Sequence, residues 1–295
     1  MGLPVTYVIG DVGGHAGALG RTLIAIGADP VTWQLPEGVC VVSVGDLIDR
    51  GPDSLRCVEI ARACYEANDG NYIQLAGNHE ANWIEESSPY FNTKSDPAAV
   101  AALRKWVGSG GIYLAAAIEG RGRGTLVTHA GMTSALWEAL GEPRSALEAA
   151  ALINNAWDGE LHANVVRPGL MLSGGSSKYG GGVYWAEAAR ELAMSWRATT
   201  MPFDQVHGHS SAWRWRDGCW EVANFGEKRW IDEKRRHVIT EIGGAKIVGV
   251  DPGLWVTDSV SFEAYPVVGA ATTPGRSVSD LSARRREREF LSRAY

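Results

Sequence analysis

Five short polar segments, each placed directly after a run rich in β-branched residues, constrain this chain most. In chain order they are VIGDVGGH (Val8 to His15), GDLIDRGP (Gly45 to Pro52), GNHE (Gly77 to Glu80), THAG (Thr128 to Gly131) and HGHS (His207 to Ser210). Runs of this kind predict buried strands, so each segment falls where a strand ends and a loop begins. Open α/β sheets place their sites at that edge, and Asp, Asn and His are ligands for divalent metals. The sequence therefore predicts an α/β fold with a metal site gathered from several strand ends.

Two of these segments carry family signatures. GDLIDRGP is close to a GDxVDRG pattern, and GNHE matches a second pattern outright. Both segments resemble those of the calcineurin-like metallophosphoesterases, and within them the phosphoprotein-phosphatase branch. The chain is most similar to bacterial-type enzymes of this branch, such as those like the lambda-phage protein phosphatase and the symmetrical diadenosine tetraphosphatase. The resemblance covers the chain from about Thr6 to Trp255. It implies a two-sheet β-sandwich flanked by helices.

The resemblance also implies two divalent metal ions a few ångström apart. Asp46 would bridge the ions, and Asp11 would complete the first site with it. The second site would add one ligand from each of the last three segments: Asn78, His129 and His209. This oxygen and nitrogen ligand set admits Fe, Co²⁺ or Zn²⁺, and we expect Mn²⁺. Such a pair clamps a phosphate and lowers the pKa of an attacking water.

Three further residues would carry the chemistry that the resemblance implies. His79 would protonate the leaving alkoxide, Asp49 would orient the ring of His79, and Arg50 would grip phosphate oxygens with its planar fork. The reaction would be direct attack of a metal-bound hydroxide on a phosphate ester, without a phosphoenzyme. A second phosphate-binding cation is also expected, and its candidates are Arg121, Arg167, Arg197 and Lys178.

The first segment departs from the family pattern. The family usually has GDxHG, whose histidine binds the first metal, whereas this chain has Gly13 at that position. We favour the interpretation that the flexible glycine pair Gly13-Gly14 lets His15 reach the first metal. Two alternatives stay open: water or a carbonyl replaces the histidine, or the protein is a one-metal or non-catalytic binder of phosphate or a nucleotide.

The sequence leaves the substrate open. A phosphorylated protein, a small phosphate ester or an anhydride would fit, so we expect a bacterial-type protein phosphatase or a small-molecule phosphatase. A dinucleoside polyphosphate hydrolase is the alternative, because several of the 12 tryptophans crowd the segment SAWRWRDGCW after HGHS and could stack on a base. A packed core or a partner interface would explain these tryptophans equally well.

Charge, hydropathy and cysteine content indicate which partners and which cellular compartment to expect. The net charge is −6, so no overall basic field attracts nucleic acid, and we expect neither a nucleic-acid partner nor a nuclease. The amino terminus has no basic and apolar leader pattern, and the longest apolar runs are too short to cross a bilayer, so we expect no membrane association. The four cysteines form no CxxC pair, which is typical of buried, reduced thiols in a cytoplasmic protein.

Periodicity predicts how the chain is divided. Helical spacing follows Pro52 and recurs at Pro97–Val107 and about Thr133–Ala156. Strand patterns return later, at Asp204–His207, Cys219–Ala223, His237–Ile242 and Ala245–Val250. Between them, the glycine- and serine-rich stretch 157–184 predicts a long functional or mobile loop. We expect one metallophosphoesterase domain over residues 1–270 and a disordered, charged tail over residues 271–295.

Overall fold

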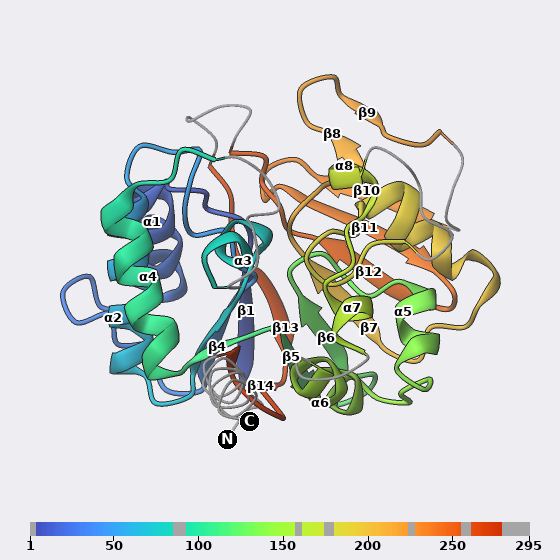
Figure 1. The fold of residues 1–295 in the computed structure, drawn as a ribbon, viewed down its shortest axis with the longest axis horizontal. Coiled ribbons are helices and arrows are strands. Elements are labelled where there is room, and N and C mark those ends of the chain that lie inside the picture. The colour runs from blue at the N-terminus through green and yellow to red at the C-terminus, as the bar shows by residue number, and fades with distance from the viewer. Residues whose placement is uncertain are drawn as a thin grey trace, which may run out of the picture.

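The protein folds as two β-sheets packed face to face, with helices on the outer side of each sheet (Figure 1). This architecture is seen in a computed structural model, which describes residues 4–84, 93–156, 161–173, 180–223, 228–254 and 261–278. The fold predicted from the sequence, an α/β sandwich flanked by helices, is confirmed.

The first sheet contains most of the parallel strands. Its order is β13 (Tyr265–Val268), β1 (Val5–Ile9), β2 (Val39–Ser43), β3 (Tyr72–Leu75) and β4 (Ile112–Tyr113). β1, β2, β3 and β4 run parallel to one another, and β13 runs antiparallel to β1. Because β1, β2 and β3 point the same way, their carboxyl ends meet at one edge of the sheet.

The second sheet is larger and mixed. Its order is β10 (Lys228–Asp232), β11 (His237–Ile242), β12 (Ala245–Gly249), β7 (Asp204–His207), β6 (Thr125–Thr128), β5 (Ala115–Glu119) and β14 (Ala270–Thr272). Its three central strands, β12, β7 and β6, are parallel to one another. A separate two-stranded hairpin, β8 (Trp213–Arg214) and β9 (Cys219–Trp220), follows the last predicted metal segment.

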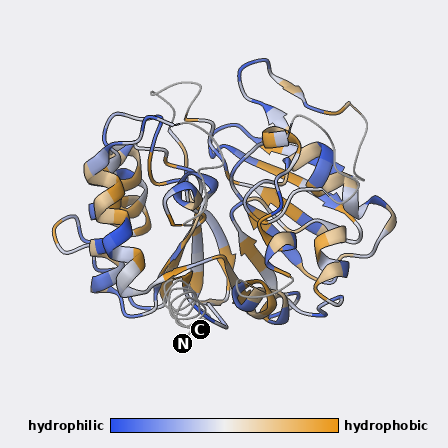
Figure 2. Cartoon of the chain, viewed as in Figure 1, coloured by the Kyte–Doolittle hydropathy of each residue, from blue (hydrophilic) through white to orange (hydrophobic). Residues whose placement is uncertain are grey.

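The two sheets share an apolar layer of mostly β-branched side chains. Val8 and Val42 from the first sheet and Val127, Val206 and Val248 from the second are all at most 2% exposed. Figure 2 shows the strands as predominantly hydrophobic where the sheets face each other. This packing holds the strand ends of both sheets together at one edge.

Helices cover the outside of both sheets. On the first sheet lie α1 (Ala16–Ile26), α2 (Ser54–Ala67), α3 (Asn78–Ile84) and α4 (Pro97–Ser109). On the side of the second sheet lie α5 (Ser134–Ala139), α6 (Ala146–Asn155), α7 (His162–Val165), α8 (Leu170–Ser173), the π-helix η2 (Ala188–Ala193) and the 3₁₀ turn η3 (Trp196–Ala198). The single helix predicted over Thr133–Ala156 is two helices, because Gly141 (φ 84°) and Pro143 interrupt it.

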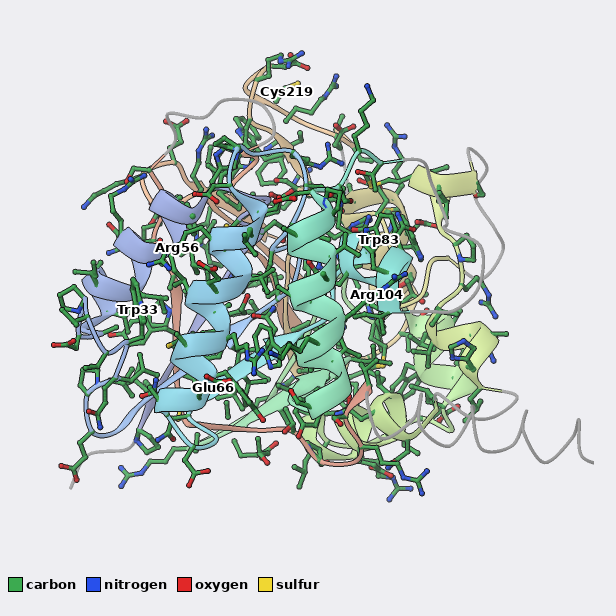
Figure 3. The ribbon with its side chains drawn as sticks, turned by 60° about the vertical axis from the view of Figure 1, so that its left-hand side comes forward. Trp33, Arg56, Glu66, Trp83, Arg104 and Cys219 are labelled. Atoms are coloured by element: carbon green, nitrogen blue, oxygen red, sulfur yellow. The ribbon has the colours of Figure 1, made fainter. Side chains whose placement is uncertain are left out.

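Figure 3 looks onto α1, α2 and α4, which lie side by side. Asp53 caps α2 by accepting a hydrogen bond from the backbone N–H of Arg56. The side chain of Arg104 on α4 lies over the ring of Trp83, 5.7 Å from its centroid, and donates to the carbonyl of Trp83. These contacts fasten α4 to α3, the helix that carries the GNHE segment.

The ordered fold extends past the domain boundary predicted at residue 270. Ala271 in β14 pairs with Ile118 in β5, and the side chain of Val278 is fully buried. The rest of the predicted tail, residues 279–295, lies outside the described residues, as do 157–160 and 174–179 of the predicted loop. Among the residues that the structure describes, no helix is both long and apolar enough to cross a membrane.

Candidate metal centre and active site

The predicted ligands meet where the strands of the two sheets end. Asp11 follows β1, Asp46 follows β2 and Asn78 follows β3, while His129 and His209 follow β6 and β7 of the opposite sheet. Two glycines permit this close approach. A Cβ on Gly77 would lie 2.2 Å from Oδ1 of Asp46, and a Cβ on Gly208 would lie 1.9 Å from Oδ1 of Asp11. The glycines of the GNHE and HGHS segments are therefore required by the ligands that lie against them.

Lone-pair atoms face one another at the predicted second metal site. The ring N–H at Nδ1 of His129 donates to the carbonyl of Val44 at 3.0 Å, and burial lowers the pKa of His129, so the neutral ring keeps a lone pair on Nε2. That Nε2 lies 2.9 Å from Oδ1 of Asn78 and 3.6 Å from Oδ1 of Asp46, both of which can only accept. Nδ1 of His209 lies 2.9 Å from the same Asn78 oxygen. The atoms of Asp46, Asn78 and His129 are of the kind that bind a divalent cation, and His209 contacts this set through Asn78.

The first site is more acidic. Ligand atoms of its two carboxylates, Asp11 and Asp46, and of His129 from the neighbouring second site lie within 4.8 Å of one another. Asp11 accepts two hydrogen bonds from the backbone N–H of His209, yet burial and then the charges of Asp251 and Asp46 hold its pKa well above its usual value. Burial alone would raise the pKa of Asp46, but nearby histidines, led by His129, lower it overall. A bound cation would relieve the repulsion among these buried carboxylates.

His15 lies at the start of α1 and is 9% exposed. It does not belong to the group formed by Asp11, Asp46 and His129, and it does not line the cleft described below. Gly13 does line that cleft. The relation of His15 to the first metal therefore stays a prediction.

Glu80, the last residue of GNHE, braces the ligand loops from beneath. Its carboxylate accepts from the backbone N–H groups of Asp46 at 2.7 Å, Leu47 at 2.8 Å and Gly77 at 2.8 Å. Burial, together with the charge of Asp46, raises the pKa of Glu80 to about 7. Glu80 thus ties the loop after β2 to the loop after β3, a role that the motif alone does not reveal.

The predicted proton donor and its partner form a buried pair. Nδ1 of His79 donates to Oδ2 of Asp49 at 2.6 Å, while the backbone N–H of His79 donates to Oδ1 of Asp46 at 3.1 Å. Asp49 also accepts from the hydroxyls of Thr93, at 3.0 Å, and Ser95. Burial raises the pKa of Asp49, but these bonds lower it overall, so Asp49 is ionised and fixes the tautomer of His79.

Four non-glycine residues of the site have left-handed backbone geometry: Asp46 (φ 52°), Asp49 (φ 71°), Arg50 (φ 61°) and His209 (φ 63°). This region costs free energy for residues with a side chain, and such strain concentrates at functional sites. In this protein it aims the side chains of two loops into the same space.

A cleft of about 870 Å³ opens over the ligands. Asp11, Asp46, Asn78 and His209 form part of its lining, and the exposed Arg50 reaches it beside them. Three more arginines line it: Arg190, Arg214 and Arg216. Of the candidates for the second phosphate-binding cation, Arg121, Arg167 and Arg197 do not line this cleft, and Lys178 lies outside the described residues. Arg190 and Arg214 each pair with Glu221, at 3.2 Å and 3.4 Å.

Two of the tryptophans singled out in the sequence, Trp213 and Trp215, line this cleft from the hairpin side. Trp213 packs edge-on against Trp220, with ring centroids 5.2 Å apart. By contrast, Trp196 is fully buried and donates to the carbonyl of Met132, and Trp230 is 43% exposed on β10. The cluster therefore serves two purposes, and only part of it faces the site.

Asp251 is an acidic residue of the cleft that the sequence did not single out. It follows β12, is 5% exposed and lines the cleft. Its Oδ1 accepts from the backbone N–H of Gly253 at 2.8 Å. Burial, opposed in part by that bond, raises the pKa of Asp251 to about 6. The segment GAKIVGVDPG resembles a late strand and turn of the family, which was the available signal for this position.

Residues 5–213 match the sequence profile of the family described as calcineurin-like phosphoesterase. The chain belongs to this family. It is also 35% identical over 91 residues to serine/threonine-protein phosphatase 1 of Salmonella typhimurium strain LT2, a match that spans 29% of this chain and only 39% of that relative. The similarity supports the phosphoprotein-phosphatase branch that the motifs predict.

The chain is similar to two solved structures of other proteins. A cold-active protein-tyrosine phosphatase of a psychrophilic Shewanella species is 15% identical, with a TM-score of 0.50 over 90% of this chain and 75% of that chain. A putative diadenosine tetraphosphatase is 16% identical, with a TM-score of 0.39 over 90% of this chain and 94% of that chain. At these identities the first likeness concerns the fold alone.

Proposed function

We propose that the protein is a phosphohydrolase that depends on two divalent metal ions, with Mn²⁺ as the expected metal. The observation that carries this proposal is the meeting of lone-pair atoms from Asp46, Asn78 and His129 beside the His79–Asp49 pair. Asp46 and Asn78 also line the cleft. When bound, the ions would neutralise phosphate charge and lower the pKa of the attacking water.

The chain's own residues would perform the remaining tasks. Arg50, exposed in the cleft, would bind two phosphate oxygens with its planar guanidinium. The ring of His79, held by Asp49, would deliver a proton to the leaving oxygen. Arg190 or Arg216 would supply the second cation on the phosphate, since both line the cleft.

The proposed substrates are a phosphorylated protein or a small phosphate ester. The relative named above by sequence similarity is a serine/threonine-protein phosphatase, which supports a phosphoprotein. A dinucleoside polyphosphate is a second candidate, because Trp213 and Trp215 offer aromatic faces in a cleft much larger than one phosphate. The third hypothesis, a non-catalytic binder, gives no role to the hydrogen-bonded pair of His79 and Asp49, so we do not favour it.

The test is hydrolysis of an aryl phosphate monoester by the chain after metal is removed and Mn²⁺ is returned. We expect turnover only with metal, and its loss in Asp46→Asn, since Asp46 serves both proposed sites. A phosphopeptide and a dinucleoside tetraphosphate are then compared by kcat/KM. Mn²⁺ binding without turnover on any of the three substrates would favour the non-catalytic binder.

A further inference from the structure

Gly13 leaves the first metal site one side chain short. With Asp11 and Asp46 alone, that site has two protein ligands, against four for the second site. The space at Gly13 is open: a Cβ built there would have no neighbour closer than 3.8 Å. Gly13 lines the cleft, so the position where the family has its histidine faces the site.

The end of β12 brings another carboxylate to the same place. A Cβ on Gly10 would lie 1.9 Å from the carbonyl oxygen of Val250, so the chain just before Asp11 and the chain just before Asp251 touch across the two sheets. The backbone N–H of Val250 donates to the carbonyl of His207 at 2.8 Å, which fixes this strand end beside the HGHS segment. Asp11 and Asp251 therefore leave neighbouring strand ends and line one cleft.

The carboxylate of Asp251 is available to a ligand. The side chain is 95% removed from solvent, and its remaining accessible part borders the cleft. Oδ1 accepts one hydrogen bond, from Gly253, and no hydrogen bond or ion pair reaches Oδ2 from the described residues. Arg236, whose charge acts on Asp251, stacks on Trp215 at 4.5 Å instead. Because Asp251 lines the cleft and its Oδ2 has no partner among the described residues, this oxygen can bind a cation there.

We propose that Asp251 is the third protein ligand of the first metal, in place of the histidine that Gly13 removes. This inference rests on the proposed function and deepens it. Asp251 lies outside the group formed by Asp11, Asp46 and His129, so its side chain turns toward the ion on binding, restrained by the single bond to Gly253. An all-carboxylate first site favours harder ions such as Mn²⁺ over Zn²⁺.

The experiment counts bound ions rather than turnover. Chelator-stripped wild type, Asp251→Asn, His15→Ala and Asp217→Asn are equilibrated with a series of Mn²⁺ concentrations, and metal per chain is measured by mass spectrometry. Asp217 is the matched control, because it is an exposed acidic residue of the same cleft, paired with Arg214. Thermal unfolding in chelator verifies that each variant is folded.

We expect two ions in wild type and Asp217→Asn, and one ion in Asp251→Asn, with affinity for the other weakened by at least about tenfold. The electron paramagnetic resonance signal of a spin-coupled Mn²⁺ pair should give way to that of an isolated ion. The double variant Gly13→His, Asp251→Asn should bind the second ion again, which would show that both side chains serve the same coordination position. Histidine is suited to residue 13 because it tolerates positive φ better than most residues.

Two other results would overturn the inference in distinguishable ways. Asp251→Asn with two ions at wild-type affinity would remove Asp251 from the site while leaving the proposed function intact, and loss of an ion in His15→Ala would then assign the position to His15. Wild type that binds no Mn²⁺ would overturn the proposed function together with the inference.

Discussion

Replacing His79 with asparagine should separate proton donation from metal binding. The amide of asparagine can occupy the place of Nδ1 and still donate to Asp49, so the buried carboxylate keeps its partner. The bond from the backbone N–H of residue 79 to Asp46 is also kept. What disappears is the ring nitrogen on the far side, the one that would face a leaving group.

The expected loss follows from that single change. Removing a general acid lowers turnover by roughly two to four powers of ten. At about 1.4 kcal/mol for each tenfold step, this is roughly 3 to 6 kcal/mol of transition-state stabilisation. Mn²⁺ content should stay at the wild-type value, because no atom within the metal site is altered.

The assay compares two aryl phosphates whose leaving groups differ in basicity. A nitrophenolate departs without a proton, whereas a simple phenolate, whose acid has a pKa of about 10, gains from protonation. The deficit of His79→Asn should therefore be larger for the phenyl ester. His237→Asn, at a buried histidine outside the cleft, should retain wild-type kcat. Equal deficits for both esters, or full activity, would refute His79 as the proton donor.

Three other predictions test the support of the site and the fold. Gly208→Ala should weaken Mn²⁺ binding, because the new methyl would lie 1.9 Å from Oδ1 of Asp11 and displace that carboxylate. Gly108→Ala, at an open helical position, should leave Mn²⁺ binding unchanged, and counting bound metal per chain tests both. Asn154→Ala removes hydrogen bonds to Leu114, Ala115 and Pro274 and should cost roughly 3 kcal/mol in denaturant unfolding, against little for the exposed Asn155→Ala. Burial raises the pKa of the Cys57 and Cys64 thiols to about 12, so both should resist a thiol reagent at pH 8 until the protein unfolds, and labelling of either in the native state would contradict their burial.

The strands and helices with strong periodicity could be predicted because local sequence determines them. The predicted strand Asp204–His207 has the observed bounds of β7, and the pattern at Pro97–Val107 lies within α4. β13 and β14 were missed, since each is held by pairing with a strand far away in the sequence, β1 and β5 respectively, rather than by a pattern of its own. β10 was also missed, although it pairs with the next strand, β11. Tyr265–Val268 contains Pro266, and it pairs along β1 only at the edge of the sheet.

The site divides in the same way. Motif residues such as Asp46, Asn78 and His79 could be proposed from the sequence, because they follow β2 and β3 within recognisable segments. Thr93 and Ser95 were not, since nothing near them in the sequence indicates that their hydroxyls reach Asp49, 44 and 46 residues away. Arg214 was missed for a related reason, because the two-residue strand Trp213–Arg214 is too short for its sequence to indicate which way its side chains point.

The meeting of strand ends explains why this fold tolerates a change such as Gly13. Side chains from both sheets reach one edge, and the close contact between Gly10 and Val250 sets a second carboxylate near Asp11 independently of the first segment. A ligand lost from one loop can therefore be replaced from a loop of the opposite sheet, without altering the core between Val8 and Val248. If Asp251 binds the first metal as we propose, the departure of this chain from the family motif is a relocated ligand rather than a lost site, and ion counting in Asp251→Asn tests this.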